Sequence, residues 1–189
     1  MTKPELRAYF RKVREEYVFN ANSIQLEPAN TALFRQLEAA GLLAGIIGGY
    51  AAMTSEIDPL ETQKSYVEKG GQVALPFFTD RQSPMEFREW TGEALTAGPF
   101  GLRQPAGDAP KLSPNTLLIP LVAVDRAGNR VGQGQGHYDR YLAENRAKQP
   151  LTTIGLAWEC QIAEEIPADP WDEPLDYIAT PERLIKVTS

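Results

Sequence analysis

The first twenty residues carry apolar side chains in a helical rhythm. These side chains recur at spacings of four, three and four residues, at Leu6, Phe10, Val13 and Tyr17. Such spacing places them on one stripe of an α-helix that faces a core. Thr2, Pro4 and Glu5 form a capping-box start with proline in the first turn. The pattern therefore predicts a helix that begins at about residue 2.

Further along, helical patterns alternate with short apolar runs. Helices are expected over residues 28–40 and 59–69, each followed by glycine, and from Tyr138 to about Ala147. Strands are expected over residues 42–50, 73–78, 85–90, 117–124, 152–158 and 177–180. Residues 98–114 are rich in glycine, proline and alanine and lack periodicity, which predicts a loop or lid.

This alternation predicts one domain over residues 1–189 with an α/β fold. Strands that alternate with helices typically form a mostly parallel central sheet flanked by helices, in three layers. In such sheets the ligand crevice lies at the carboxyl ends of the strands. A chain of 189 residues with 42% hydrophobic content is long enough for one sizeable core and short for two ordinary domains.

The charge balance narrows the classes of partner. There are 19 basic and 25 acidic residues, so the net charge of -6 would repel nucleic acids and anionic membranes on average. Cys160 is the only cysteine, which excludes an internal disulfide and fits a reducing compartment. No apolar run approaches the roughly 20 residues of a membrane span, and the charged first residues do not resemble a signal peptide. We expect a cytoplasmic monomer whose partners are small molecules.

A glycine-rich loop follows the most apolar run of the chain. Its glycines alternate, at Gly132, Gly134 and Gly136. Missing Cβ atoms let backbone N–H groups approach a ligand closely, and Asp139 and Arg140 follow where a helix N-terminus would favour anions. The spacing matches neither a P-loop nor the GxGxxG of dinucleotide folds. The combination indicates a phosphate cradle beside a carboxylate for Mg²⁺, with a second carboxylate supplied by residues 169–176.

Several other residues keep two interpretations each. A basic stripe on the first helix is either a solvated face or an arm that reaches a polyphosphate, and it comprises Lys3, Arg7, Arg11 and Arg14. Glu56 and Asp58 are either turn or helix-cap acids or ligand contacts past a strand end. His137, the only histidine, either donates to phosphate or is a hydrogen-bonded loop residue. The aromatic residues are chiefly core candidates, of which one or two could wall a flat ligand.

The run from Asp125 to Leu142 resembles the signature of the 5-formyltetrahydrofolate cyclo-ligase family, which reads roughly fD..G.RlGyGgGyYDr.L. The matching positions are Asp125, Gly128, Arg130, Gly132, Gly134, Gly136, Tyr138, Asp139, Arg140 and Leu142. The early KPELR resembles the family's K..lR, SEIDP resembles its E.dT loop, and residues 101–105 resemble its GI.EP segment. The tail resembles its Q…P…D…D pattern at Gln161, Pro167, Asp172 and Asp176. The resemblance thus covers nearly the whole chain in order.

This resemblance implies sites for ATP, Mg²⁺ and a folate. The implied ATP-binding residues are Lys3, Pro4, Glu5, Leu6, Arg7, Gly132, Gln133, Gly134, Gln135, Gly136, His137, Tyr138, Asp139 and Arg140. Among them, Lys3 and Arg140 are the implied catalytic cations. Asp139 and Asp172 are the implied metal ligands, and Glu56 and Ala51 the implied substrate contacts.

The reaction that the resemblance implies converts 5-formyltetrahydrofolate into 5,10-methenyltetrahydrofolate with release of ADP and phosphate. ATP phosphorylates the formyl oxygen, N10 attacks the activated carbon, and phosphate leaves. The protein then needs mainly to position two substrates and neutralise charge. The alternative is a non-catalytic folate or nucleotide binder on the same scaffold. A relation to sugar-phosphate isomerases or acyl-CoA transferases is fold analogy alone and leaves the motifs unexplained.

The chain departs from the family pattern at a few positions. Gln133, Gln135 and His137 stand where the family often has aromatic residues or glycine, Pro59 replaces a threonine, and Gln104 replaces a glutamate. We expect the side chain of Gln135 to point away from the phosphates. None of these changes removes a charged group that the implied reaction needs.

Overall fold

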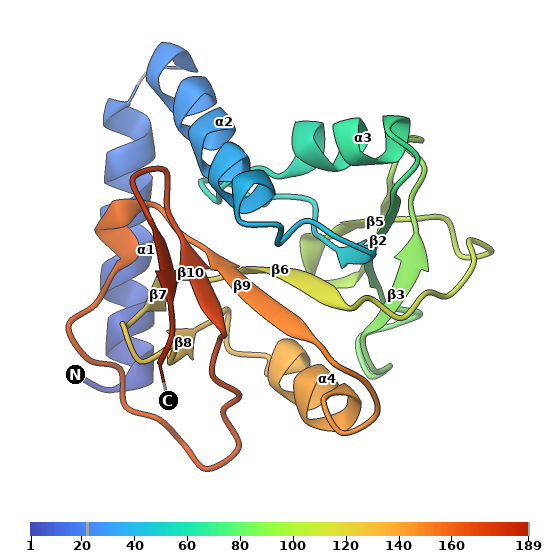
Figure 1. Ribbon diagram of the computed structural model, residues 1–189. Coiled ribbons are helices and arrows are strands. Elements are labelled where there is room, and N and C mark those ends of the chain that lie inside the picture. Colours follow the sequence, from blue (N-terminus) through green and yellow to red (C-terminus); the bar gives the residue numbers. More distant parts are fainter. Residues whose placement is uncertain (22, 189) are drawn as a thin grey trace.

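The chain is built around a seven-stranded sheet with the order β11-β10-β9-β6-β1-β2-β3 (Figure 1). The computed structural model describes residues 1–21 and 23–188. The strands are β1 (Ile46–Gly48), β2 (Gln72–Phe77), β3 (Glu86–Glu89), β6 (Thr116–Pro120), β9 (Thr152–Leu156), β10 (Tyr177–Ala179) and β11 (Leu184–Lys186). The inner pairs are parallel, and the two edge pairs are antiparallel. The predicted mostly parallel sheet is confirmed.

Helices and two short ribbons complete the described part of the chain. The helices are α1 (Lys3–Asn20), α2 (Ser23–Ala39), α3 (Leu60–Glu68) and α4 (His137–Asn145), with 3₁₀ turns η1 (Pro99–Gly101) and η2 (Glu159–Gln161). The ribbons pair β4 (Thr96–Ala97) with β5 (Arg103–Gln104) and β7 (Ala123–Val124) with β8 (Arg130–Val131).

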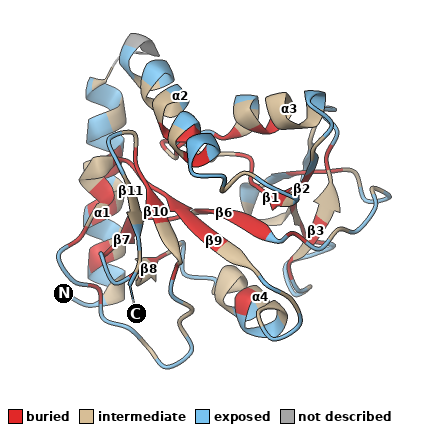
Figure 2. Cartoon of the chain, in the orientation of Figure 1, coloured by how far each residue is buried: buried red, intermediate tan, exposed pale blue. Residues whose placement is uncertain are grey.

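The core lies on both faces of the sheet, because neighbouring residues of a strand point to opposite faces. Leu117 and Ile119 pack in one cluster with Leu142 of α4. Leu118 packs in another cluster with Leu33 of α2. Helix α3 joins a smaller cluster around β2. Buried residues accordingly follow the sheet and the inner sides of the helices (Figure 2). The predicted three-layer arrangement is confirmed.

Helix α1 packs at the end of the sheet, against the β7–β8 ribbon. Leu6 and Phe10 share a cluster with Val131 of this ribbon, as the apolar stripe predicts. Further along the helix, the prediction that the apolar stripe faces the core is wrong. Tyr17 is 38% exposed, whereas Arg14 is only 2% exposed. The side chain of Arg14 therefore points into the molecule, at a position where the sequence suggests a solvated face.

Several predicted boundaries also change. The run over 117–124 splits because β6 ends at Pro120 and Val122 donates its N–H to Val131 in the ribbon, at 2.7 Å. The strand predicted over 42–50 narrows to β1. Helix α2 begins at Ser23, earlier than predicted, and Pro28 lies inside it, where its missing N–H removes one backbone hydrogen bond. The loop predicted over 98–114 contains η1 and β5. Strands β4, β8 and β11 are not among the predicted elements.

The strand order reverses beside β1. The chain continues from β1 through α3 to β2 on one side, and β6 lies on the other side. Ligands of open α/β sheets bind outside the carboxyl ends of the strands at such a switch point. In the described chain, no helix has both the length and the apolar character needed to cross a membrane.

Candidate functional site

A cavity of about 580 Å³ lies at this switch point. Its walls include segments that directly follow β1 and β2, the end of β6, the glycine loop and the first turns of α1: Lys3, Arg7, Tyr50, Ala51, Met53, Glu56, Phe78, Pro120 and residues 130–139. These segments meet because the carboxyl ends of parallel strands share one edge of the sheet. The predicted crevice at the strand ends is confirmed.

Part of the cavity wall holds cations that are paired with carboxylates. Lys3 Nζ lies 2.6 Å from Asp169 Oδ2 and also contacts Asp172. Burial opposes the charge of Lys3, but the hydrogen bonds to these two aspartates raise its pKa overall. Arg130 pairs with Asp139, with 2.6 Å between Nη2 and Oδ1. Burial lowers the pKa of Arg130, and Asp139 opposes that change. A bound polyphosphate would compete with the carboxylates for both cations.

The glycine loop adopts backbone conformations that suit glycine. Gly134 has φ +98° and Gly136, which directly precedes α4, has φ +64°. The loop packs on α1, because Arg7 Nε donates to the carbonyl of Gly132 at 2.8 Å. A Cβ atom at Gly134 would lie 3.3 Å from the guanidinium carbon of Arg7. The first turn of α4 then presents backbone N–H groups that lack helical acceptors, an arrangement that favours an anion.

Glu56 is a nearly buried carboxylate, with 6% of its side chain exposed. The N–H of Met53 donates to its Oε2 at 3.0 Å, and Gln133 Nε2 donates to its Oε1 at 3.3 Å. Arg14 Nη1 lies 3.9 Å from Oε1. Burial raises the pKa of Glu56, while the Met53 bond and the Arg14 charge oppose the rise. This carboxylate is held in place and has remaining acceptor capacity for a ligand that carries N–H groups.

Aromatic rings line another part of the cavity. The His137 ring centroid lies 4.6 Å from that of Phe78 and 5.0 Å from that of Phe100. Gln104 fixes Phe78, because its amide accepts from the Phe78 N–H and donates to the Phe78 carbonyl, both at 3.1 Å. Flat apolar walls of this kind suit a conjugated ligand.

Tyr138 brings an unusual hydroxyl to the same cavity. Its oxygen is buried and has no hydrogen-bond partner among the described residues. Burial, reinforced by the charge of Glu56, raises the pKa of Tyr138 far above its ordinary value. The hydroxyl therefore stays protonated and can donate to a ligand. The cavity thus combines a glycine-rich loop, carboxylates, a held glutamate and aromatic walls.

The model of the 5-formyltetrahydrofolate cyclo-ligase family matches residues 2–181. The chain belongs to this family. A relative from Mycolicibacterium smegmatis named 5-formyltetrahydrofolate cyclo-ligase is 32% identical over 146 residues, covering 72% of this chain and 73% of the relative. The protein of the same name from Escherichia coli K12 is 40% identical over 70 residues, 37% of this chain and 38% of that one. Family membership makes the chain a carbon-nitrogen ligase of folate one-carbon metabolism.

Solved structures support the fold. The NMR structure of Aquifex aeolicus 5,10-methenyltetrahydrofolate synthetase has a TM-score of 0.80 at 23% identity and covers 100% of this chain and 94% of that one. A 5,10-methenyltetrahydrofolate synthetase from Mycoplasma pneumoniae has a TM-score of 0.74 at 21% identity, over 96% and 99% of the two chains. At these identities the likeness concerns the arrangement of helices and strands.

Most residues that the cyclo-ligase resemblance implies do line the cavity. They are Lys3, Arg7, Ala51, Glu56, Asp172 and residues 132–139. Four others are absent from its lining, namely Pro4, Glu5, Leu6 and Arg140. Leu6 packs in the core, and Glu5 accepts the N–H of Thr2 at 2.7 Å as part of the helix cap. Arg140 is exposed, and its Nη2 lies 3.1 Å from His137 Nδ1.

Other residues of the cavity were not among the predicted site residues. Arg130 belongs to the signature, but its pairing with Asp139 depends on the bend between β8 and α4. Phe100 lies in a segment predicted to be a loop, and Trp171 is 70% exposed beside the acidic tail. A periodic pattern gives no signal for such positions, because each reaches the cavity from an irregular segment.

Proposed function

We propose that this protein converts 5-formyltetrahydrofolate into 5,10-methenyltetrahydrofolate with ATP and Mg²⁺, releasing ADP and phosphate. The observation that carries the proposal is the set of residues that line the cavity at the switch point. It joins a glycine loop and paired charges, which suit a polyphosphate, to a held glutamate and aromatic walls, which suit the pterin and the benzoyl ring of a folate. Catalysis by positioning needs both substrates in one space.

The nucleotide would bind between α1 and the glycine loop. Backbone N–H groups of residues 132–138 would face its phosphates, and the side chains of Lys3 and Arg7 would neutralise them. Arg140 follows on α4 and would act with Lys3 on the charge that develops during transfer. The roles of Pro4, Glu5 and Leu6 would be limited to holding the first turn of α1 in place. The side chain of Tyr138 would line the cavity behind the loop, with its hydroxyl free to donate to a ligand.

The acidic residues beside the loop fit a magnesium ion. Mg²⁺ takes oxygen ligands, usually one or two carboxylates together with waters and phosphate oxygens. Asp139 and Asp172 line the cavity and would serve as these carboxylates. Within the residues described, no three or more His, Cys, Asp or Glu side chains gather as a metal group, so the remaining ligands would come from ATP and water. When bound, the ion would neutralise charge on the phosphates.

The folate would occupy the remainder of the cavity. Glu56 would accept hydrogen bonds from the N–H groups of the pterin edge, and Ala51, which is buried, would form part of the wall. Arg14 and the N–H of Met53 would keep the Glu56 carboxylate in position. Phe78 and Phe100 would contact the flat parts of the ligand.

The chemical steps require little acid-base work from the protein. The formyl oxygen bonds to the γ-phosphorus while the bond from that phosphorus to the bridging oxygen breaks, and ADP leaves. N10 then attacks the formyl carbon and loses its proton, and the carbon-oxygen bond to phosphate breaks. Lys3 and Arg140 would stabilise the charge on the transferring group. A chain with one histidine and no nucleophile motif can therefore perform the reaction.

A direct assay tests the proposal. Purified protein is mixed with 5-formyltetrahydrofolate, ATP and Mg²⁺, and the near-ultraviolet absorbance of the methenyl product is followed. We expect a signal that requires both ATP and Mg²⁺. Folate binding without an ATP-dependent signal would contradict the proposed reaction and favour a non-catalytic binder.

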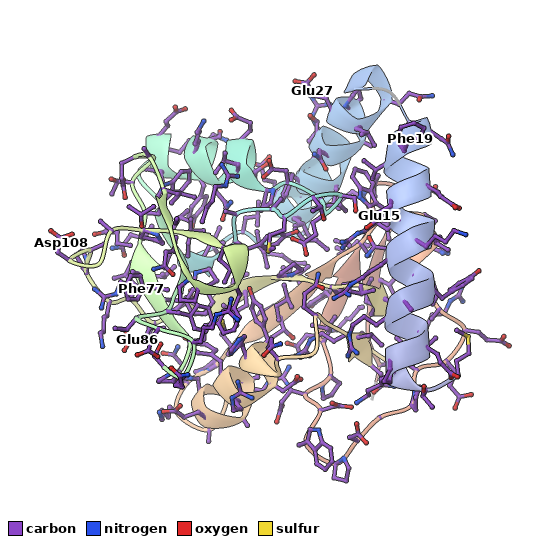
Figure 3. All side chains as sticks on the ribbon, turned by 180° about the vertical axis from the view of Figure 1, so that it is seen from behind. Glu15, Phe19, Glu27, Phe77, Glu86 and Asp108 are labelled. Atoms are coloured by element: carbon purple, nitrogen blue, oxygen red, sulfur yellow. The ribbon has the colours of Figure 1, made fainter. Side chains whose placement is uncertain are left out.

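Asp139→Asn tests the metal role. The substitution preserves side-chain shape but removes the charge, so turnover should fall at least about tenfold and more Mg²⁺ should be needed for half-maximal rate. Asp108→Asn is the matched control, because Asp108 lies at a loop tip far from α1 (Figure 3) and should retain full activity. An Asp139→Asn enzyme with an unchanged Mg²⁺ requirement would argue against this role.

A further inference from the structure

His137 occupies two environments at once. Its backbone begins α4 beside the glycine loop, whereas its ring packs between Phe78 and Phe100 in the aromatic part of the cavity. The two parts of the residue can therefore serve different ligands. The backbone N–H belongs with the phosphate cradle, and the imidazole faces a region whose walls are apolar rings.

The contact with Arg140 determines the proton position on the imidazole. Arg140 Nη2 lies 3.1 Å from His137 Nδ1. A guanidinium group has donors and no acceptor, so Nδ1 must accept this hydrogen bond. The ring proton of the neutral imidazole is then on Nε2. With Nδ1 as the acceptor of the Arg140 hydrogen bond, the ring carries only the Nε2 proton and is neutral.

The Nε2–H group lacks a partner. The Nε2 atom is buried and makes no hydrogen bond to any of the residues that the structure describes. Leaving a donor buried and unsatisfied costs about 1–3 kcal/mol, and functional sites are where such groups persist. His137 also lines the cavity, so a ligand there can satisfy the group.

We infer that the His137 side chain positions the folate, as a neutral imidazole that donates from Nε2–H to a carbonyl oxygen of that ligand. This inference rests on the proposed substrate and assigns the side chain to the folate instead of ATP. A phosphate would be served better by a cation, and Arg140 already disfavours a positive ring at this position. A neutral donor between two aromatic rings matches an uncharged carbonyl on a flat conjugated molecule.

Because His137 is the only histidine, nuclear magnetic resonance of ¹⁵N-labelled protein reports on it without ambiguity. In the free protein we expect nitrogen shifts of an Nε2–H tautomer. Adding 5-formyltetrahydrofolate without ATP, so that no turnover occurs, should move the Nε2 signal. Adding ATP and Mg²⁺ without folate should leave it nearly unchanged. A Nε2 signal that responds to ATP, or to neither ligand, would overturn the inference.

Two substitutions give an independent measurement. His137→Phe keeps the ring packing and removes the donor, so the KM for 5-formyltetrahydrofolate should rise about tenfold while the KM for ATP stays within about twofold. His137→Gln keeps a donor and should restore much of the folate affinity. A rise in the KM for ATP as large as the rise in the KM for 5-formyltetrahydrofolate would contradict the inference. The nuclear magnetic resonance result does not depend on turnover, so it stands or falls separately from the proposed reaction.

Discussion

Arg14 is the side chain that departs most from its sequence prediction. It belongs to a basic stripe, yet its Nε donates to Ser55 Oγ at 2.9 Å and its Nη1 to the carbonyl of Leu121 at 3.1 Å. These acceptors lie 41 and 107 residues further along the chain, so no local sequence pattern predicts them. Lys3 and Arg7 of the stripe line the cavity, whereas Arg14 lies inside the molecule, which neither interpretation of the stripe predicted.

Arg14→Met should destabilise the protein. The substitution leaves Glu56 without its nearby positive charge and removes the donors to Ser55 Oγ and the Leu121 carbonyl, and breaking a buried pair of this kind costs about 3 kcal/mol. Urea unfolding measures the loss. Arg11→Met, one turn earlier on α1, should change the free energy of unfolding by less than about 1 kcal/mol, because Arg11 contacts the exposed Gln133 side chain. Equal losses in the two variants would refute the structural role of Arg14.

Glu56→Gln should weaken the binding of folate more than the binding of ATP. A hydrogen bond to a charged group contributes about 1.5–3 kcal/mol, so the KM for 5-formyltetrahydrofolate should rise at least about tenfold. The KM for ATP should change little. Asp58→Asn is the control in the same loop, since Asp58 is exposed and accepts the N–H of Leu60. A larger effect on ATP would place Glu56 at the nucleotide end of the cavity.

Gln104 replaces a glutamate of the family pattern and makes contacts that a glutamate could not make. The sequence gives glutamine where the family pattern has glutamate, and nothing in the local pattern explains the change. In the structure the amide both accepts from and donates to the backbone of Phe78. A carboxylate could only accept. The contact was unpredictable because residues 78 and 104 are 26 residues apart in the chain and meet only in the folded structure.

The helices and strands that sequence predicts best are those that pack on one side only and end at a clear stop signal. Helices α3 and α4 lie within two residues of their predicted bounds at each end, since each has one apolar side and a clear stop. The run over 117–124 is apolar throughout but serves two sheets, and apolarity alone does not mark where a chain changes sheet. The glycine loop was predicted as a cradle, although its packing on Arg7 depends on the placement of α1.

Gly136→Ala should disturb this loop through backbone strain. A residue with a Cβ atom at φ +64° costs about 1–2 kcal/mol. The added Cβ would also lie 3.0 Å from Arg140 Nη1. Gly132→Ala is the matched control, because a Cβ there meets nothing within 4 Å and its φ is ordinary. In thermal unfolding of the free protein, Gly132→Ala should be close to wild type. A similar loss in both variants would indicate that the left-handed conformation is unimportant.

At the scale of the whole molecule, α1 joins distant parts of the chain to one cavity. Its first turns contact Asp169, Asp172 and Gly132, and Arg14 reaches the loop that follows β1. Figure 1 shows α1 at the edge of the molecule, with the segment that leads to β10 passing its lower end. Nucleotide binding should consequently be coupled to global stability.

ATP with Mg²⁺ at about 100 times the dissociation constant should add about 2.7 kcal/mol to the free energy of unfolding. Lys3→Met should reduce this gain at the same ligand concentrations, because it removes a cation from the site. Lys12→Met is the control on the same helix, since Lys12 is exposed and pairs with Glu16 at 3.7 Å. Chemical unfolding with and without ligand measures the gain. The coupling would be disproved if Lys3→Met kept the full gain.

The contact between Lys3 and Asp172 also bears on how the protein is made. During synthesis residue 3 leaves the ribosome long before its partners, because Asp169 and Asp172 lie 166 and 169 residues further along the chain. The apolar side chains of Leu6 and Phe10 in helix α1 also stay exposed until the β7–β8 ribbon has been synthesised and packs on them. A chain that is cut short before residue 169 lacks the carboxylates that hold Lys3, whatever the state of its sheet. Only a chain that extends beyond residue 172 can thus assemble the end of the cavity where we propose that the nucleotide binds.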